Sequence, residues 1–382
     1  MPKMSRSELF KRIALLLAAI VFALLLGEGL VRALGRYDMS FPYVEDWNGI
    51  MAGRPGAHGR HRVGGLFDAY VSFNQQRFRG TAETKLEAAP GVLRIAALGD
   101  SFTMGWGAED DQTYPARLQV LLQQELGRPV EVLNAGVGGT GTGEQALYYR
   151  RWVARFHPEI VVLAVNASDT GDDELRELFA VGADGVGIPR SPEAIYQSRR
   201  RFRRFRAFVL SLPGFDFLDK HSRLFGLVRN VAWRMSHRQE WTEQEALENA
   251  LRLTAAEVRW LDRQVRESGG RLFVVYMPQR ESIYPPQDEQ ERVIEERLPA
   301  TLRDLCEKEQ VPFSNLTPAV RVAAANSPQE IYYPRQDPHP TPQGYAVFAE
   351  QVTGLIRANL RPPGEAAAPA SPMAASGKLP LP

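Results

Sequence analysis

The fold is decided by residues 93–103, LRIAALGDSFT, in which a mainly apolar run ends in a turn of small and polar residues. Residues 93–98 have the length and apolar character of a strand buried on both faces. Helical spacing follows at 114–126, and strands and helices then alternate. This alternation predicts an α/β fold, a three-layer α/β/α sandwich with a mostly parallel sheet of about five strands. The predicted strands are 93–98, 130–133, 160–165, 271–277 and 311–314, and the predicted helices are 114–126, 143–156, 243–267, 289–309 and 342–360.

The rest of the chain divides around this alternating core, which we expect to span 91–360. Residues 35–90 mix Gly, Arg, Pro and aromatic residues without sustained periodicity, so we interpret them as a connector that packs on the domain. The alternation breaks at 172–241, a predicted insertion too long for a plain loop and placed to shape the active-site entrance. Residues 361–382 are rich in Ala and Pro, and this composition predicts a disordered tail.

The N-terminus has the pattern of a membrane-inserting segment. Residues 1–12 carry four basic side chains, and residues 13–34 are mainly apolar. The pattern predicts a single-pass signal anchor in the inner membrane, with a cytoplasmic N-terminus and a periplasmic catalytic domain. The alternative is a signal peptide cleaved near Ala33-x-Gly35, a site that follows Arg32 directly. Either interpretation exports the remainder of the chain.

Composition excludes several classes of function. The formal net charge of +1 gives no basic excess, so we expect no nucleic-acid partner. Cys306 is the only cysteine and cannot form an internal disulfide. Cysteines and histidines with zinc-finger spacing are absent from the sequence. We therefore expect neither a metal nor a cofactor.

Ser101 is the first candidate for chemistry. It follows the 93–98 strand through Gly99 and Asp100, and ligands of open α/β sheets bind at the carboxyl ends of strands. Small Gly99 permits a tight turn, after which Ser101 begins a helix. A serine in this setting is also a common helix cap, so the turn alone does not decide its role.

His339 is the second candidate, at the other end of the chain. Thr341 and Pro342 are typical of a helix start, and they place His339 on the loop before the final helix. A neutral histidine there can take a proton from a serine hydroxyl, while Asp337 orients its ring. The alternative is a surface turn with an incidental histidine. The other histidines lack such a setting: His58, His61, His157, His221 and His237.

Three blocks in this chain resemble the SGNH/GDSL hydrolases. They are GDSFT at 99–103, NAGVGGTG at 134–141 and DPHPTPQGY at 337–345, in the order that the family has. The resemblance covers 91–360 apart from the insertion. It implies a serine ester hydrolase that forms an acyl-enzyme on Ser101, with His339 as base and Asp337 as its partner. The implied substrate is an O-acyl ester, above all an O-acetyl ester, of an extracytoplasmic glycan or lipid.

The resemblance also implies an oxyanion hole. Its donors are the backbone N–H of Ser101 and that of Gly139, with Gly138 as the neighbouring alternative. The third donor departs from the family, because Ser168 stands where an asparagine is usual. Asn166, two residues earlier, faces the same side of an extended segment and is the alternative.

The acidic partner of the histidine stands at a different spacing from the one that is common in the family. Family members commonly place it three residues before the histidine, where this chain has Gln336, whereas Asp337 stands two before. The two-residue spacing is similar to that of polysaccharide O-acetyltransferases related to this superfamily. An O-acyltransferase acting on an envelope or exported polysaccharide is therefore the alternative function. A catalytically inactive glycan-binding module is a third hypothesis.

Two further features are open to interpretation. The run from Arg199 to Arg206, RRRFRRFR, has aromatic residues at roughly helical spacing. It predicts contact with anionic lipid or an acidic polysaccharide, or else an ordinary solvated arginine face. Trp106, close to the nucleophile, either lines the pocket or serves the structure.

Overall fold

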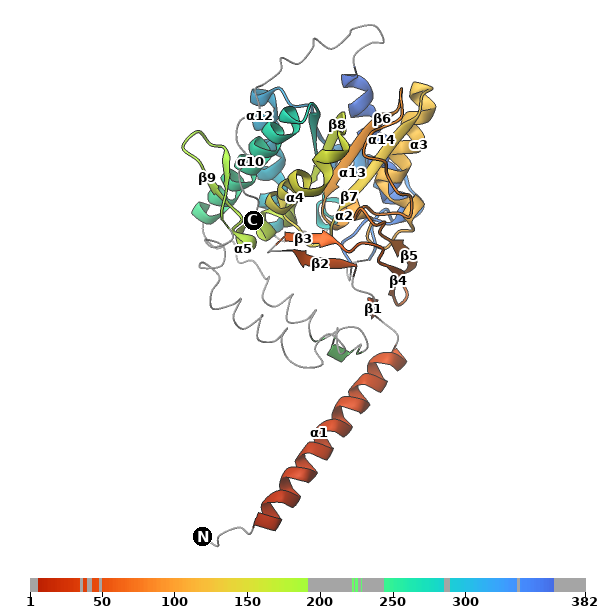
Figure 1. Ribbon diagram of the computed structural model, residues 1–382, viewed down its shortest axis with the longest axis vertical. Helices are drawn as coiled ribbons and strands as arrows, with labels where there is room; N and C mark the ends of the chain where they lie inside the picture. Colours follow the sequence, from red (N-terminus) through yellow and green to blue (C-terminus); the bar gives the residue numbers. More distant parts are fainter. Residues whose placement is uncertain are drawn as a thin grey trace.

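A five-stranded sheet forms the centre of the protein (Figure 1). The computed structural model describes residues 6–34, 37–39, 43–47, 50–191, 222, 224–225, 228, 244–284, 289–334 and 337–360. The strand order is β12-β11-β8-β6-β7, and all neighbours in it run parallel. The strands are β6 (Leu93–Gly99), β7 (Val130–Gly136), β8 (Ile160–Val165), β11 (Arg271–Tyr276) and β12 (Phe313–Asn315).

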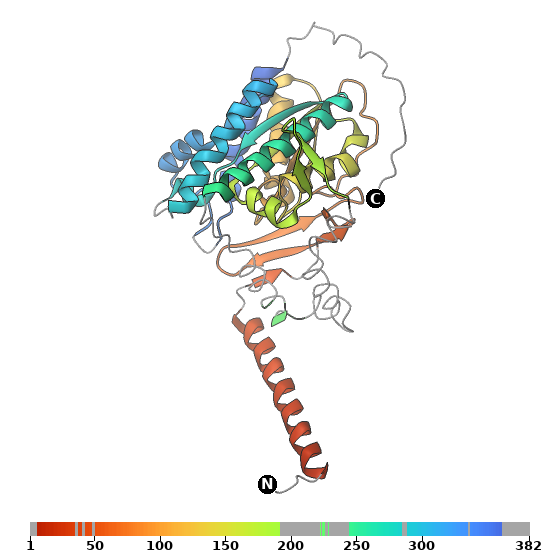
Figure 2. The same ribbon diagram turned by 90° about the vertical axis from the view of Figure 1, so that its left-hand side faces the viewer.

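Helices cover both faces of this sheet (Figures 1 and 2). The first face carries α3 (Tyr114–Leu126), α13 (Thr317–Asn326) and α14 (Pro342–Asn359). The second carries α4 (Thr142–Tyr148), α10 (Gln244–Glu267) and α12 (Glu289–Glu309). The predicted three-layer α/β/α sandwich with five parallel strands is confirmed.

Strand β6 shows why residues 93–98 have to be mainly apolar. All its residues are buried. Ile95 and Ala97 pack into the core beneath α3 and α14, whereas Ala96 and Leu98 pack into the core beneath α4 and α10. Arg94 is the exception in the run, and its guanidinium is satisfied by Glu131 at 2.7 Å and by two backbone carbonyls.

Several elements differ from the sequence prediction. The helix predicted at 143–156 ends as α4 at Tyr148 and continues as a π-helical turn, η2 (Tyr149–Val153), and a 3-10 turn, η3 (Ala154–Phe156). His157 then adopts a left-handed conformation with φ of 48°. Helix α13 was not predicted, although its TPAV start carries the proline that typically opens a helix. The remaining short helices are α2 (Ser101–Met104), η1 (Asp110–Gln112), α5 (Ala167–Arg176) and α11 (Arg280–Ile283).

The segment before the sandwich contains regular structure. Three short strands, β1 (Tyr37–Met39), β4 (His58–Val63) and β5 (Phe67–Ser72), form an antiparallel sheet, and β2 (Val44–Trp47) pairs with β3 (Ile50–Gly53). Val71 and Phe73 pack against Met104 of α2. The sequence did not predict these strands because each has only three to six residues and little apolar alternation.

Part of the predicted insertion is described. Residues 172–176 complete α5, and β9 (Phe179–Val181) pairs with β10 (Gly187–Pro189) as a hairpin that packs on α10. The run from Arg199 to Arg206 and the tail at 361–382 lie outside the described residues, so their predictions stay predictions.

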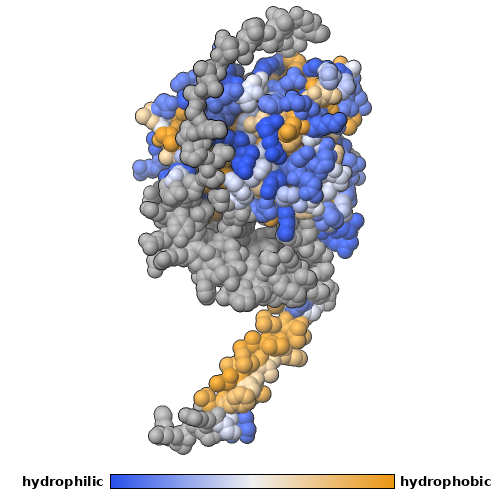
Figure 3. Space-filling view, in the orientation of Figure 1, coloured by the Kyte–Doolittle hydropathy of each residue, from blue (hydrophilic) through white to orange (hydrophobic). Residues whose placement is uncertain are grey.

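One helix among the described residues is long and apolar enough to cross a membrane. It is α1 (Arg6–Leu34), whose apolar window runs from Ser7 to Val31 and has no buried residue. Figure 3 shows it as a hydrophobic column beside a mainly hydrophilic domain. Its 25-residue window corresponds to about 37 Å of helix, enough for a hydrocarbon core of about 30 Å. A signal sequence has the same composition.

Candidate active site

Ser101 lies directly after β6, at the carboxyl end of the sheet. Asp100 caps the short helix α2 by accepting a hydrogen bond from the Phe102 N–H at 2.9 Å. A side chain at Gly99 would place its Cβ 2.1 Å from Thr103 Oγ1 and 3.2 Å from the Ala164 carbonyl oxygen. Glycine is therefore required for the tight turn that presents Ser101, whose side chain is close to fully buried.

The side chains of Ser101, His339 and Asp337 are joined by a chain of hydrogen bonds. Ser101 Oγ is 2.8 Å from His339 Nε2, although the two residues are 238 positions apart in the chain. His339 Nδ1 is 2.6 Å from Asp337 Oδ1. Because an ionised carboxylate only accepts, Nδ1 carries the proton and Nε2 is free to accept from the serine hydroxyl. This arrangement suits transfer of the serine proton to the imidazole.

The loop before α14 holds the histidine in place. Thr341 caps α14 by accepting from the Gly344 N–H, and Tyr333 N–H donates to the His339 carbonyl at 2.9 Å. The two-residue spacing brings the His339 backbone N–H to Asp337 Oδ1 as well, at 3.1 Å. Gln336, at the position three before the histidine, lies outside the described residues.

Asp337 is a buried carboxylate whose two oxygens have different partners. Oδ1 accepts twice from His339, and Oδ2 accepts from Trp106 Nε1 at 2.9 Å. Burial acts to raise the pKa of Asp337, but the hydrogen bonds and charge of His339 and the bond from Trp106 outweigh it and lower this pKa below its ordinary value. The carboxylate is thus ionised and available to stabilise an imidazolium.

The two glycines of the second block differ in their surroundings. A Cβ on Gly138 would lie 3.7 Å from Ser101 Cβ, so Gly138 borders the serine directly. Gly139 has a left-handed φ of 74° and open space where its side chain would be. Its carbonyl accepts from Arg176 Nη2 at 3.3 Å.

Asn166 and Ser168 occupy unequal positions after β8. Asn166 is buried and caps α5, because its Oδ1 accepts from the Ser168 N–H at 2.9 Å and from Ser168 Oγ at 2.6 Å. Its Nδ2 donates to Asp100 Oδ2 at 2.9 Å. Ser168 is exposed. The sequence did not predict the bond between Asn166 and Asp100, although both residues follow strands, β6 and β8, that are neighbours in the sheet.

Helices α5 and α10, which contact each other, carry buried carboxyl groups that the sequence did not predict. Asp173 accepts from the Gly143 N–H at 2.9 Å and from Thr254 Oγ1 at 3.3 Å. Burial, together with the charge of nearby Asp173, raises the pKa of Glu257 well above its ordinary value. Burial also raises the pKa of Asp172 to about 8. Within the described ranges, no group of His, Cys, Asp and Glu is arranged to hold a metal ion.

A model of the GDSL-like lipase/acylhydrolase family matches residues 97–347, which include Ser101, Asp337 and His339. The chain belongs to this family. Because the family and the site agree, this GDSL-like protein is a hydrolase of ester bonds. The expected membership of the SGNH/GDSL superfamily is confirmed.

Solved structures similar to this GDSL-like hydrolase include other esterases. A catalytic mutant of Axe2, an acetylxylan esterase from Geobacillus stearothermophilus, is 14% identical, with 69% of this chain and 93% of that chain covered and a TM-score of 0.39. The acetyl xylan esterase AlAXEase is 13% identical, with 69% and 99% covered and a TM-score of 0.42. TesA is 14% identical, with 70% and 99% covered and a TM-score of 0.39. Among curated proteins, none matches this chain.

Proposed function

We propose that the protein removes short acyl groups, above all acetyl, from O-acyl esters by way of an acyl-enzyme on Ser101. The observation that carries this proposal is the 2.8 Å separation of Ser101 Oγ and His339 Nε2. At this distance the imidazole takes the hydroxyl proton as Oγ attacks the ester carbonyl. Asp337 stabilises the imidazolium that results.

The second half of the reaction uses the same residues. His339 returns its proton to the leaving alcohol, and the acyl group stays on Ser101. A water molecule, deprotonated by His339, then attacks the acyl-enzyme and releases the free acid. Both halves pass through an oxyanion, which backbone N–H groups and side-chain donors stabilise.

For the oxyanion hole we propose the backbone N–H of Ser101, that of Gly139 with Gly138 as the alternative, and one side chain after β8. Ser168 and Asn166 remain the two candidates for that side chain. The Asn166 amide keeps one of its two protons after donating to Asp100. Ser168 Oγ is exposed and reaches the substrate only by leaving Asn166 Oδ1.

The space beside the nucleophile supports a short acyl group. Ser101 is 9% exposed. A Cβ placed on Gly138 would lie 3.5 Å from the Tyr43 hydroxyl and 3.8 Å from Met104 Sδ, in addition to its contact with Ser101. Tyr43 and Met104 therefore lie close to the Gly138 backbone beside the serine, and we propose that they limit the length of the acyl chain.

We propose an extracytoplasmic location and a glycan or lipid ester as substrate. Residues 13–34 are the apolar part of helix α1, and the four basic residues at 1–12 precede this part in the sequence. The positive-inside rule then holds the N-terminus in the cytoplasm and the catalytic domain in the periplasm. Acyl esters of envelope glycans and lipids are the esters available there.

Hydrolysis of nitrophenyl esters of increasing acyl length by the full chain in mild detergent tests the proposal. We expect acetate to be the best substrate, and Ser101→Ala and His339→Gln to be inactive. His58→Gln, a change at an exposed histidine, serves as the matched control and keeps wild-type activity. Equal rates for wild type and Ser101→Ala would remove the proposal, and failure of a fluorophosphonate to label Ser101 would favour a glycan-binding module.

Acyl transfer to a sugar is the second candidate, favoured by the two-residue spacing of Asp337 and His339. The first half-reaction is unchanged, and a sugar hydroxyl replaces water in the second. Adding candidate glycan acceptors to the acetate assay distinguishes the two. Acylated glycan formed faster than free acid supports transfer, whereas free acid alone with every acceptor supports hydrolysis.

A further inference from the structure

Trp106 contacts both residues that act on the nucleophile. It lies in the turn that follows α2, five positions after Ser101. Its indole Nε1 donates to Asp337 Oδ2 at 2.9 Å. Its ring stacks on the His339 imidazole, with 4.9 Å between the centroids and 21° between the planes. One side chain thus touches the carboxylate and the base together.

A second histidine supports the same indole. His61 of β4 packs edge-on against Trp106, with centroids 4.2 Å apart and planes at 81°. Burial lowers the pKa of His61 to about 3, so this ring is neutral at physiological pH and adds no charge beside the triad. The contact brings the segment before the sandwich to the catalytic centre.

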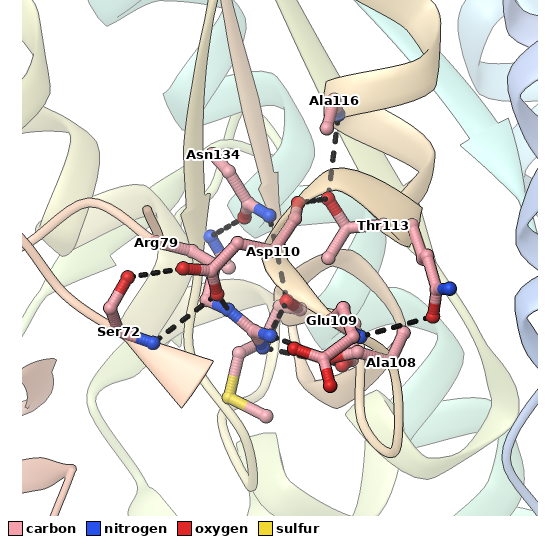
Figure 4. Close-up of polar contacts among 12 residues, drawn as sticks. Ser72, Arg79, Ala108, Glu109, Asp110, Thr113, Ala116 and Asn134 are labelled. Carbon is pink, nitrogen blue, oxygen red and sulfur yellow. Dashed lines mark hydrogen bonds and ion pairs between the residues drawn. The ribbon is translucent and has the colours of Figure 1, made fainter. Parts of the chain in front are cut away.

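Arg79, from the same N-terminal segment, fixes the backbone of the turn that carries Trp106 (Figure 4). Its Nη1 donates to the carbonyls of Met104 and Gly105 at 3.0 and 3.3 Å, and its Nη2 to the Ala108 carbonyl at 2.7 Å. Its Nε pairs with Asp110 at 2.6 Å. The Arg79 side chain is 1% exposed, so its guanidinium donates to this turn and to Asp110 and not to solvent.

Two more bonds tie the turn to its surroundings. The Tyr345 hydroxyl of α14 donates to the Trp106 carbonyl at 3.1 Å, which joins the turn to the helix that follows His339. Asp110 also accepts from the Ser72 N–H at 3.2 Å and from its hydroxyl (Figure 4). The position of the indole is therefore set from both the β5 side and the α14 side.

We infer that Trp106 is a positioning residue, which holds the Asp337 carboxylate and the His339 ring in the orientation that proton transfer from Ser101 requires. The inference rests on the proposed roles of these three residues. Asp337 Oδ1 accepts two hydrogen bonds from His339, and Oδ2 accepts one from the indole N–H. Without that bond a buried carboxylate oxygen loses its partner, and the carboxylate is free to rotate away from the ring. His61 and Arg79 hold the indole in place.

Trp106→Phe tests the inference because phenylalanine keeps an aromatic ring and lacks the N–H. The matched control is Trp260→Phe, at a buried tryptophan of α10 that packs on Phe179. We expect Trp106→Phe to lower kcat for nitrophenyl acetate about tenfold, as for loss of one hydrogen bond to a charged group, with KM within about twofold of wild type. Trp260→Phe should leave kcat unchanged. Equal kcat in all three proteins overturns the inference.

A measurement without substrate separates this inference from the proposed function. The proton between His339 Nδ1 and Asp337 Oδ1 is expected to give a low-field NMR resonance that is absent from His339→Gln. We expect Trp106→Phe to move or broaden this resonance and Trp260→Phe to leave it in place. A resonance unchanged by Trp106→Phe overturns the positioning role. If wild type and Ser101→Ala are equally inactive, the proposed function fails, and the resonance still decides the role of Trp106.

Discussion

Asp173→Asn is expected to stabilise the protein, and to do so more strongly at higher pH. Asp173 is 3% exposed and accepts hydrogen bonds from Gly143 and Thr254. Burial raises its pKa to about 7, even though the hydrogen bond from the Gly143 N–H acts to lower it. Asparagine has the same shape, still accepts from the Gly143 N–H and never ionises. The change therefore removes the charge and keeps the packing.

The sign and size of the expected change in unfolding free energy follow from linkage between protonation and folding. An unfolded aspartate titrates near 3.9, so the folded state binds this proton more tightly. Its contribution to stability is fully present below about pH 4 and is lost as pH rises to about 7. At about 1.4 kcal/mol per pKa unit, the loss amounts to at most about 4 kcal/mol. Because Asp173 lies among other buried carboxyl groups that titrate together with it, we expect a gain of about 2 kcal/mol for Asp173→Asn at pH 8, and under about 1 kcal/mol at pH 4.5.

Urea unfolding of the full chain in mild detergent at the two pH values measures this gain. The control is Asp184→Asn, at an exposed aspartate whose pKa is lowered by a hydrogen bond from the Val186 N–H. We expect this control to show no increase in stability between pH 4.5 and pH 8. A gain for Asp173→Asn that is the same at both pH values, or absent from both, refutes the argument that a buried charge at Asp173 opposes folding.

Three further changes have defined outcomes. Asp337→Asn should lower kcat about 10³- to 10⁴-fold with little change in KM, because the amide no longer stabilises the imidazolium; steady-state kinetics with nitrophenyl acetate measures this. Ser168→Ala should lower kcat about 10²-fold if its hydroxyl is the third oxyanion donor, and a wild-type rate in the same assay would assign that role to Asn166. Gly99→Ala should cost more than about 2 kcal/mol of unfolding free energy, measured by urea denaturation, because its Cβ would lie 2.1 Å from Thr103 Oγ1; an unchanged midpoint would contradict the steric argument.

Much of the fold is predictable from periodicity. A parallel sheet covered on both faces needs strands that are apolar throughout, and β6 and β8 are buried at all of their positions. Boundaries were less predictable. Strand β7 extends to Gly136, three residues beyond the predicted end, because the backbone ladder continues through Asn134 to Gly136 whatever their side chains.

Some residues of the candidate site are likewise predictable from the sequence, and others are not. The GDSFT and DPHPTPQGY blocks are local, so the sequence alone marked Ser101, Asp337 and His339 as candidates. Trp106 has no local signal of its role, because its partner Asp337 is 231 positions away. The strands before the sandwich are short, and nothing in the pattern of this segment indicates that His61 and Arg79 reach the candidate site.

The sequence by itself determined the parallel α/β sandwich, the family and the residues suited to serine chemistry, because burial on both faces and tight turns impose residue types over a few neighbouring positions. Tertiary structure alone decided which donors and acceptors meet: Asn166 with Asp100, Trp106 with Asp337, and Thr254 with Asp173. A hydrogen bond depends on which strand ends and helices become neighbours in space. That choice is made by packing of the whole chain, and no single stretch of sequence records it.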